Sequence, residues 1–576
     1  MGDYILGETA DLFERSSGRW VGVLDKNGKE QLVTQYSKPR SYRRAPSVRD
    51  NAASGYTASS VWQYNGSVYQ PTAAPDTTAA TWLQQQPTGA APCDVMGVSA
   101  ICAGGVVAMK AGFTGPAITL TATVSSSPVT TDINILAGGE LDVDAVRKVF
   151  ASADAGTQIY VTKIFDQSGG AKHLTMITSA GKITRGFYLV WDVLMNRYVI
   201  AADQGYGTDG QGLAFDATMS VQETSMSAFF FGRGVGSQGD VNSQIVATFG
   251  TGATALSIHT GEGSVGPTLA AWNGASRRPV TANQCTPLDC KPCVAWYVGG
   301  ASSVAMGVNE DSYTAASALS TARTGGYLGN WDLASGKFPA MRFVGFAIAN
   351  ANATAVQQTK IRNWFYTKFD ALPQARDRVV FVGDSRGTLV YSNQNATSAS
   401  IGQFGANIGV QLAEKLSADC QVVNASSSGW TNADHAAKSI PGLVATVKSG
   451  VGNVAVVLIG VNDFIVSNLT AAQSFTALNA NISALKTAGY YTIVVAELRC
   501  VTATNGANTK TDELHTLINS GACLADEVVD VWGLTPIASP SNSAYYPDGL
   551  HPNGPVCGLI AAAVSARVDS VLRELV

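Results

Sequence analysis

The chain has 576 residues, with 38 Lys and Arg against 42 Asp and Glu, and a formal net charge of −4. This length predicts several domains, because a single hydrophobic core stops growing near about 250–300 residues. The weakly acidic balance argues against a nucleic-acid protein that depends on many phosphate contacts, and 46% apolar residues exclude wholesale disorder.

The N-terminal residues lack the pattern of an export signal. Asp3, Glu8 and Asp11 stand where a signal peptide has a basic segment and then an apolar one. No run of about 18 uncharged apolar residues was found, so neither a transmembrane helix nor membrane insertion is predicted. We therefore expect a protein that is cytosolic or that leaves the cell by a route other than secretion.

Residues 1–70 are predicted to form a small N-terminal anchor. Residues 19–33 predict two short strands joined at Asn27–Gly28, a common hairpin turn. The basic residues within 38–49 predict either an extended, solvated arm or a peptide that docks on a neighbouring subunit. Residues 71–92 are rich in Pro, Ala, Thr and Gln, which predicts a linker.

Residues 93–371 are predicted to form a β-sandwich. Short apolar runs separated by glycines are typical of antiparallel strands. A helix at 355–369 is expected to close this domain. The clearest predicted strands cover residues 117–124, 186–194, 227–232, 294–298 and 341–347.

Residues 372–576 have a different pattern, in which buried strands alternate with helices. This alternation predicts an α/β three-layer domain built on a parallel sheet. The predicted strands cover residues 378–382, 420–424, 454–459, 491–497 and 527–531, and the predicted helices include 402–416, 471–488 and 558–575.

Polar motifs stand at the ends of these strands. Gly383–Arg386 follows the first strand, Ser426–Gly429 the second and Gly460–Asp463 the third, while Asp548–Pro552 precedes the last helix. An open parallel sheet places its active site at the carboxyl ends of its strands, so we expect the four motifs to converge there.

The residue types in these motifs suit acyl transfer. Ser385 can act as the nucleophile, His551 can take its proton, and Asp548 can orient the imidazole. The backbone N–H groups of Ser385 and Gly429 and the side-chain amide of Asn462 can form an oxyanion hole. This chemistry requires no metal or organic cofactor. Each motif taken alone could equally be a helix cap or an Asx turn.

The four motifs, in this order, resemble the SGNH (GDSL-like) hydrolase family over about residues 376–576. The resemblance implies a serine esterase with Ser385, His551 and Asp548 as its triad. Gly383–Gly387 also fits the Gly-x-Ser-x-Gly pattern of α/β-hydrolases, but that fold has several strands before its serine. We therefore reject the α/β-hydrolase interpretation.

The middle domain resembles the catalytic sandwich of the arabinofuranosidase B family, and its closing strand and helix are similar to laminin-G and concanavalin-like sandwiches. That glycosidase family carries adjacent cysteines near its catalytic glutamate, and this chain has no Cys-Cys pair. The resemblance therefore implies carbohydrate binding, with no catalytic residue transferred. The matching segments are Pro92–Asp94, Gly115–Pro116, Thr131–Ile133, Phe165–Gly169 and His173–Thr175.

Other patterns are weaker. Gly205–Gly210 fits a dinucleotide fingerprint, but no amphipathic helix follows, so we interpret it as a loop. Cys285, Cys290 and Cys293 have partly metal-like spacing without a nearby fourth ligand, which favours a disulfide or simple burial over zinc. The histidines without ligand spacing are His173, His259, His435 and His515.

These patterns together predict a carbohydrate O-acetylesterase whose substrate is an acylated bacterial surface polysaccharide. The domain layout resembles phage tail fibre and tailspike proteins. This resemblance implies a virion protein that acts extracellularly at the host surface, a homotrimer by analogy, and an N-terminus that docks to a virion structure. The alternatives are a non-enzymatic virion adhesin or decoration protein that binds host glycans, and an exported bacterial esterase.

Overall fold

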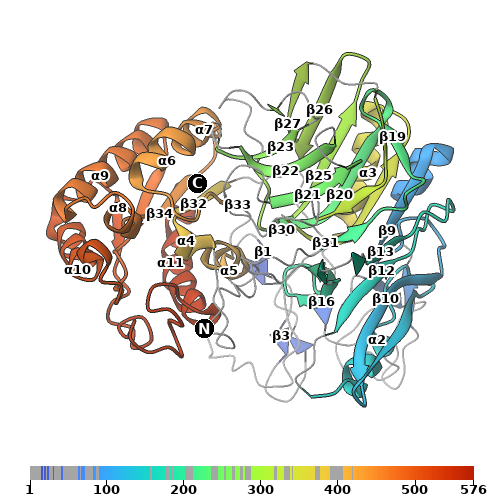
Figure 1. The fold of residues 1–576 in the computed structure, drawn as a ribbon, viewed down its shortest axis with the longest axis horizontal. Helices are drawn as coiled ribbons and strands as arrows, with labels where there is room; N and C mark the ends of the chain where they lie inside the picture. Colours follow the sequence, from blue (N-terminus) through green and yellow to red (C-terminus); the bar gives the residue numbers. More distant parts are fainter. Residues whose placement is uncertain are drawn as a thin grey trace.

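The computed structural model describes most of residues 90–575 (Figure 1). The residues outside the described part are 156–158, 177, 180–181, 184–185, 202–211, 235–243, 252–254, 263–265, 273–276, 279–286, 317–320, 330–337, 340, 370–376, 389–406, 418–419 and 576. The Gly205–Gly210 loop, Cys285 and the predicted boundary at residue 372 therefore lie outside it. Before residue 90 the structure describes β1 (Arg15–Ser16), β2 (Arg19–Trp20), β3 (Val23–Leu24), β4 (Glu30–Gln31), β5 (Arg40–Tyr42), β6 (Trp62–Tyr64), β7 (Ser67–Pro71) and β8 (Trp82–Gln85).

The N-terminal strands support one sequence prediction and correct another. Strands β3 and β4 pair antiparallel on either side of the predicted Asn27–Gly28 turn. The linker prediction for residues 71–92 is wrong at residues 82–85, because β8 pairs with β7 in a four-stranded sheet. A Trp-Leu pair favours a strand more than the Pro- and Thr-rich surroundings suggest.

The part of the chain from residue 90 to 369 forms a β domain. Among the described residues, its main sheet joins 19 strands, and β21 and β30 are the one pair in it that runs parallel. The short pairs β14–β15 and β19–β28 lie outside that sheet. The antiparallel, β-rich character that the sequence predicted is thus confirmed. The strands are β9 (Ala100–Gly105), β10 (Gly115–Val124), β11 (Ser127–Ile135), β12 (Tyr160–Ile164), β13 (Leu174–Met176), β14 (Thr178–Ser179), β15 (Lys182–Ile183), β16 (Phe187–Asp192), β17 (Arg197–Ala201), β18 (Leu213–Ala214), β19 (Ser220–Gln222), β20 (Ser227–Gly234), β21 (Gln244–Phe249), β22 (Leu256–Glu262), β23 (Gly266–Trp272), β24 (Arg277–Arg278), β25 (Pro292–Gly299), β26 (Ser303–Val308), β27 (Asp311–Ala316), β28 (Ala322–Thr324), β29 (Gly326–Leu328), β30 (Phe338–Pro339) and β31 (Met341–Ala349).

Strand β20 lies at the centre of the β domain. It pairs with β25 on one side and with β31 on the other, and all of its residues are buried. Helix α3 (Ala355–Phe369) covers one face, where Phe231 contacts Trp364 and Phe365. Because both faces of β20 are buried, its middle residues 228–232 are apolar or glycine without alternation. The other helices of the domain are α1 (Pro92–Met96) and α2 (Val143–Ser152), with 3-10 turns at Gly97–Ser99 and Glu223–Ser225.

Residues 377–575 form an α/β domain on a five-stranded sheet of order β33-β32-β34-β35-β36, with every pair parallel. Helices α5 and α11 contribute to the hydrophobic cluster on one face, and α7, α9 and α10 to that on the other. This arrangement confirms the predicted parallel sheet. The elements are β32 (Asp377–Gly383), α4 (Ser385–Thr388), α5 (Ile408–Lys415), β33 (Cys420–Asn424), α6 (Asn432–Lys438), α7 (Ile440–Ala445), β34 (Asn453–Leu458), α8 (Val461–Ile465), α9 (Ala471–Ala488), β35 (Tyr491–Val495), a 3-10 turn at Thr504–Gly506, α10 (Ala507–Leu517), a π turn at Ile518–Ala522, β36 (Glu527–Val529) and α11 (Gly554–Leu575).

Local sequence signals set the ends of the long helix α9. Thr470 and Gln473 form a capping box before its first turn, and Gly489 ends the helix in the left-handed conformation, at φ 106°. Helix α11 has the length and apolar composition of a membrane span, which the sequence analysis did not single out. Its apolar face packs on the sheet, as expected for a core helix, and Val556, Ile560 and Val564 are fully buried.

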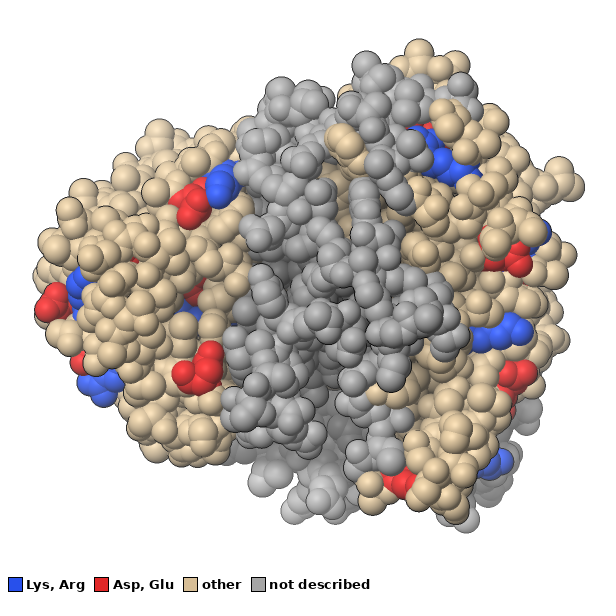
Figure 2. Space-filling view, in the orientation of Figure 1, with Lys and Arg blue, Asp and Glu red and all other residues tan. Residues whose placement is uncertain are grey.

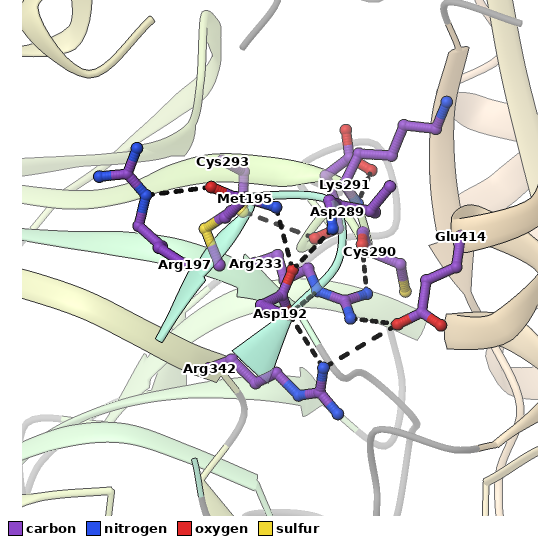
Figure 3. Close-up of polar contacts among 11 residues, drawn as sticks. Asp192, Met195, Arg197, Arg233, Asp289, Cys290, Lys291, Cys293, Arg342 and Glu414 are labelled. Carbon is purple, nitrogen blue, oxygen red and sulfur yellow. Dashed lines mark hydrogen bonds and ion pairs between the residues drawn. The ribbon is translucent and has the colours of Figure 1, made fainter. Parts of the chain in front are cut away.

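A buried ion cluster joins the two domains (Figure 3). Asp192 accepts hydrogen bonds from Arg233 at 2.6 Å and from Arg342 at 2.9 Å. Arg233 also donates to Glu414, which belongs to α5 of the α/β domain. Arg233 and Asp192 have no exposed surface, so each needs the other for charge compensation.

The β domain also covers the outer edge of the parallel sheet. The N–H of Cys290 donates to the carbonyl of Val422 in the edge strand β33 at 2.8 Å. The N–H of Val422 donates to Asp289 Oδ1 at 3.0 Å. Burial raises the pKa of Asp289 to about 6, although the N–H groups of Lys291 and Val422, which donate to its carboxylate, oppose the change. The outward N–H and carbonyl of Val422 in β33 are thus paired within the chain rather than left for another molecule.

Candidate active site

The structure brings the predicted nucleophile, base and orienting carboxylate into one hydrogen-bonded chain. Ser385 stands directly after β32, at the start of α4. Its Oγ lies 2.7 Å from His551 Nε2, and His551 Nδ1 lies 2.6 Å from Asp548 Oδ2. Ser385 is 5% exposed and His551 is 8% exposed, so the pair is shielded from bulk water.

The protonation pattern of this chain follows from Asp548. Burial by itself raises the pKa of Asp548, but the hydrogen bonds that its carboxylate accepts from His551 and from the N–H of Leu550 outweigh it and hold the pKa below its usual value. The ionised carboxylate can only accept, so the Nδ1 of His551 carries the proton and donates to it. The Nε2 of His551 is then the acceptor for the Ser385 hydroxyl.

The loop that carries Asp548 and His551 is held by its own backbone. Asp548 Oδ1 accepts from the N–H of Leu550 at 3.0 Å and from that of His551 at 2.8 Å. Gly549, which follows Asp548, has φ 74°, a conformation that favours glycine. A Cβ at this position would lie 2.1 Å from Val501 Cγ2. The three-residue spacing therefore places both side chains on one turn.

Two of the predicted oxyanion donors stand in the loops that follow the two strands beside β32. Gly429 follows β33 and Asn462 follows β34, and these two strands flank β32 in the sheet. Gly429 has φ 78°, and a Cβ at this position would meet nothing within 4 Å. The Asn462 amide donates to the carbonyl of Trp430 at 3.1 Å, which ties the two loops together. The Asn462 amide nitrogen carries two hydrogens, so its second hydrogen can bind a ligand.

Asp463, the next residue, faces away from this chemistry. Its carboxylate accepts from the N–H of Asn432 at 2.8 Å, from the Asn432 side chain at 2.7 Å, and from Ser474 Oγ at 2.6 Å. It is 1% exposed and joins α8 to α6 and α9. Asp463 therefore has a structural role.

Sequence reasoning gave no role to two buried charged residues beside the nucleophile. Arg386 follows Ser385 directly and donates to Asp384 and to Glu497. Glu497 follows β35, which places it at the same edge of the sheet. A carboxylate at the end of an apolar strand was the signal available for Glu497. Nothing in the sequence pairs it with Arg386.

The other cysteines and histidines considered in the sequence analysis have structural roles. Cys290 and Cys293 are buried free thiols, and burial raises the pKa of Cys290 to about 12. Burial lowers the pKa of His435 to about 4, and His515 stacks on Trp532. Within the described residues no group of three or more His, Cys, Asp or Glu could hold a metal ion.

The motif residues of the β domain bind its own backbone. Asp166 accepts from the N–H groups of Ala103 and Ser168 at 3.0 and 2.8 Å. The Gln167 side chain accepts from the N–H of Met109 at 2.7 Å. His173 Nδ1 accepts from the N–H of Asp166 at 3.0 Å. These side chains thus hold the loop between β12 and β13.

No protein-family model matches the chain, and no curated protein matches it. Solved structures with partial similarity include an arabinofuranosidase bound to arabinofuranosyl-α-1,2-xylobiose, at 14% identity and a TM-score of 0.36; the match covers 48% of this chain and 65% of that protein's length. A G-D-S-L family lipolytic protein from Veillonella parvula has 16% identity and a TM-score of 0.26, covering 33% of this chain and 97% of that one. An aryl esterase from M. smegmatis has 17% identity and a TM-score of 0.28, covering 34% and 100%.

Proposed function

We propose that the α/β domain is a serine esterase with Ser385, His551 and Asp548 as its triad. The observation that carries this proposal is the hydrogen-bonded chain from Ser385 Oγ through His551 to Asp548. Hydroxyl, imidazole and carboxylate in this order are what nucleophilic acyl transfer needs.

The mechanism has two halves. Ser385 Oγ attacks the ester carbonyl carbon while its proton passes to His551 Nε2, and Asp548 stabilises the imidazolium. The oxyanion of the tetrahedral intermediate accepts from the N–H groups of Ser385 and Gly429 and from Asn462. The intermediate expels the alcohol, which takes the proton from His551. Water then attacks the acyl-enzyme in the same way and releases the carboxylic acid.

Hydrolysis of p-nitrophenyl acetate tests the reaction. The wild-type protein should release p-nitrophenol, and Ser385→Ala should lower kcat by at least about 10³-fold. Ser520→Ala, which alters an exposed serine of the π turn, is the matched control and should keep normal activity. Equal activity in the wild type and Ser385→Ala would contradict the proposal and favour the adhesin alternative.

We propose that the substrate is an acylated bacterial surface polysaccharide, held by the β domain. The support is a group of exposed aromatic side chains on that domain. Trp191 is 41% exposed and Phe150 is 42% exposed, and both rings contact Tyr198, with centroids 5.3 and 6.2 Å apart. Aromatic faces of this kind can stack on the apolar faces of sugar rings.

Acetate release from purified surface polysaccharides tests the substrate. Trp191→Ala should weaken polysaccharide binding while leaving p-nitrophenyl acetate hydrolysis unchanged. Val98→Ala, which alters an exposed apolar residue elsewhere in the β domain, is the control. Unchanged polysaccharide binding by Trp191→Ala would contradict the proposal that these aromatic side chains hold the substrate.

The biological setting is also a proposal. The resemblance of the domain layout to tail fibres and tailspikes supports a phage virion protein that acts at the host surface as a homotrimer docked through its N-terminus. An exported bacterial esterase is the alternative. On the face drawn in Figure 2, the charged side chains of the described residues are scattered, which fits a glycan partner better than nucleic acid. Electron microscopy of labelled virions tests the location.

A further inference from the structure

Three charged side chains are buried beneath the nucleophile. Asp384 precedes Ser385, Arg386 follows it, and Glu497 stands beyond the end of β35. The structure leaves none of the three with exposed surface. Two carboxylates and one guanidinium thus share a space from which water is excluded.

Arg386 holds this group together. Its Nε donates to Asp384 Oδ1 at 2.9 Å and its Nη2 donates to Asp384 Oδ2 at 2.6 Å, which is a forked, two-point contact. The backbone N–H of Arg386 also donates to Asp384 Oδ1, at 3.0 Å. The residues on both sides of Ser385 are therefore closed into a ring that fixes the backbone between them.

Arg386 also reaches the loop that follows β35. Its Nη1 donates to Glu497 Oε1. Glu497 in turn lies against Gly460, where a Cβ would come within 2.6 Å of Glu497 Oε2. Gly460 begins the turn that carries Asn462 two residues later. Arg386 and Glu497 thus connect the serine turn to the asparagine turn behind the site.

Stability alone is a poor reason for such a group. Burying charges costs several kcal/mol for each ion, and replacing a buried ion group by apolar residues is often neutral or stabilising. A forked guanidinium contact does fix orientation, which an apolar contact does not. The group of Asp384, Arg386 and Glu497 lies between the Ser385 turn and the Asn462 turn, which carry the proposed oxyanion donors and must be oriented accurately.

We propose that Arg386 and Glu497 are positioning residues, which keep the Ser385 N–H and the Asn462 amide aligned on one oxyanion. This inference rests on the proposed esterase function and adds two residues to its machinery. Neither side chain touches the substrate, and both act through the backbone of the two turns. Misalignment should therefore lower kcat and leave KM nearly unchanged.

Arg378 provides a matched control at the opposite end of β32. It is 1% exposed, and it donates to Gln421 Oε1 at 3.0 Å and to the carbonyl of Thr446, away from the serine. Arg386→Lys keeps the charge but loses the fork, and should lower kcat for p-nitrophenyl acetate by about 10–100-fold. Arg378→Lys should lower Tm while kcat stays within about two-fold of the wild type.

Glu497→Gln is the second variant, because it keeps the shape of the side chain if Arg386→Lys does not fold. It should lower kcat by about 10-fold with little change in KM. Losses confined to Tm in Glu497→Gln, or equal kcat losses in Arg386→Lys and Arg378→Lys, would overturn the inference and leave the esterase standing. Wild-type hydrolysis that does not depend on Ser385 would overturn the esterase, and this inference with it.

Discussion

Replacing Asn462 by alanine separates catalysis from loop architecture. The Asn462 amide gives one hydrogen to the carbonyl of Trp430 at 3.1 Å and has a second for the oxyanion. Loss of an oxyanion donor costs about 10²–10³ in kcat, or about 3–4 kcal/mol of transition-state stabilisation. Loss of the bond to Trp430 costs only about 1 kcal/mol of folding free energy. The variant should therefore be nearly as stable as the wild type and much slower.

Asp463→Ala gives the opposite result, which makes it the comparison. Its carboxylate accepts three hydrogen bonds from Asn432 and Ser474 in a buried setting. Truncation leaves three donors unsatisfied at about 1–3 kcal/mol each, so the free energy of unfolding should fall by roughly 3–9 kcal/mol. Because a carboxylate cannot stabilise an oxyanion, the folded fraction should keep a kcat close to that of the wild type.

The assay is p-nitrophenyl acetate kinetics beside thermal melting for both variants. We expect a low kcat with near-normal Tm for Asn462→Ala, and the reverse for Asp463→Ala. If Asn462→Ala keeps its kcat and loses Tm, Asn462 only builds the loop. The oxyanion assignment would then be withdrawn.

Two further predictions concern pH and the domain interface. The pKa of Asp289 is raised from 3.8 to about 6, so its contribution to stability is present below pH 3.8 and lost as pH rises through 6. Asp289→Asn should therefore have the same Tm as the wild type near pH 4 and a higher Tm at pH 8, where its free energy of unfolding should be larger by a few kcal/mol. A lower Tm than the wild type at pH 8 would show that the ionised Asp289 carboxylate is well compensated. A fragment starting at residue 372 should hydrolyse p-nitrophenyl acetate but melt earlier and aggregate more than the full chain, and equal melting would show that the interface adds nothing.

Local patterns predicted much of the fold. Helix α9 was predicted with its observed bounds, 471–488, and the structure places a capping box and a left-handed glycine at its two ends. The apolar strands of the parallel sheet were predicted because burial on both faces leaves continuous runs in the sequence. Strand β8 was missed because its pairing with β7 is not visible in the composition of residues 71–92.

The candidate site was predictable where its residues follow strands directly. Ser385 and Asn462 were found because the fold brings the ends of adjacent parallel strands together. The link between Arg386 and Glu497 could not be found, because it joins residues 111 positions apart through side chains alone. The contact of Glu414 with Arg233 was hidden for the same reason, since it spans 181 positions and two domains.

The covered edge of β33 limits how this chain could exchange modules during evolution. Recombination that replaced the β domain by another module would also remove Asp289 and Cys290, which pair with Val422. The recombinant chain would then carry an α/β domain with a bare strand edge, which invites pairing with a second copy. Successful chimaeras should therefore either carry a substitute for this two-residue cover or turn the bare edge into a dimer contact.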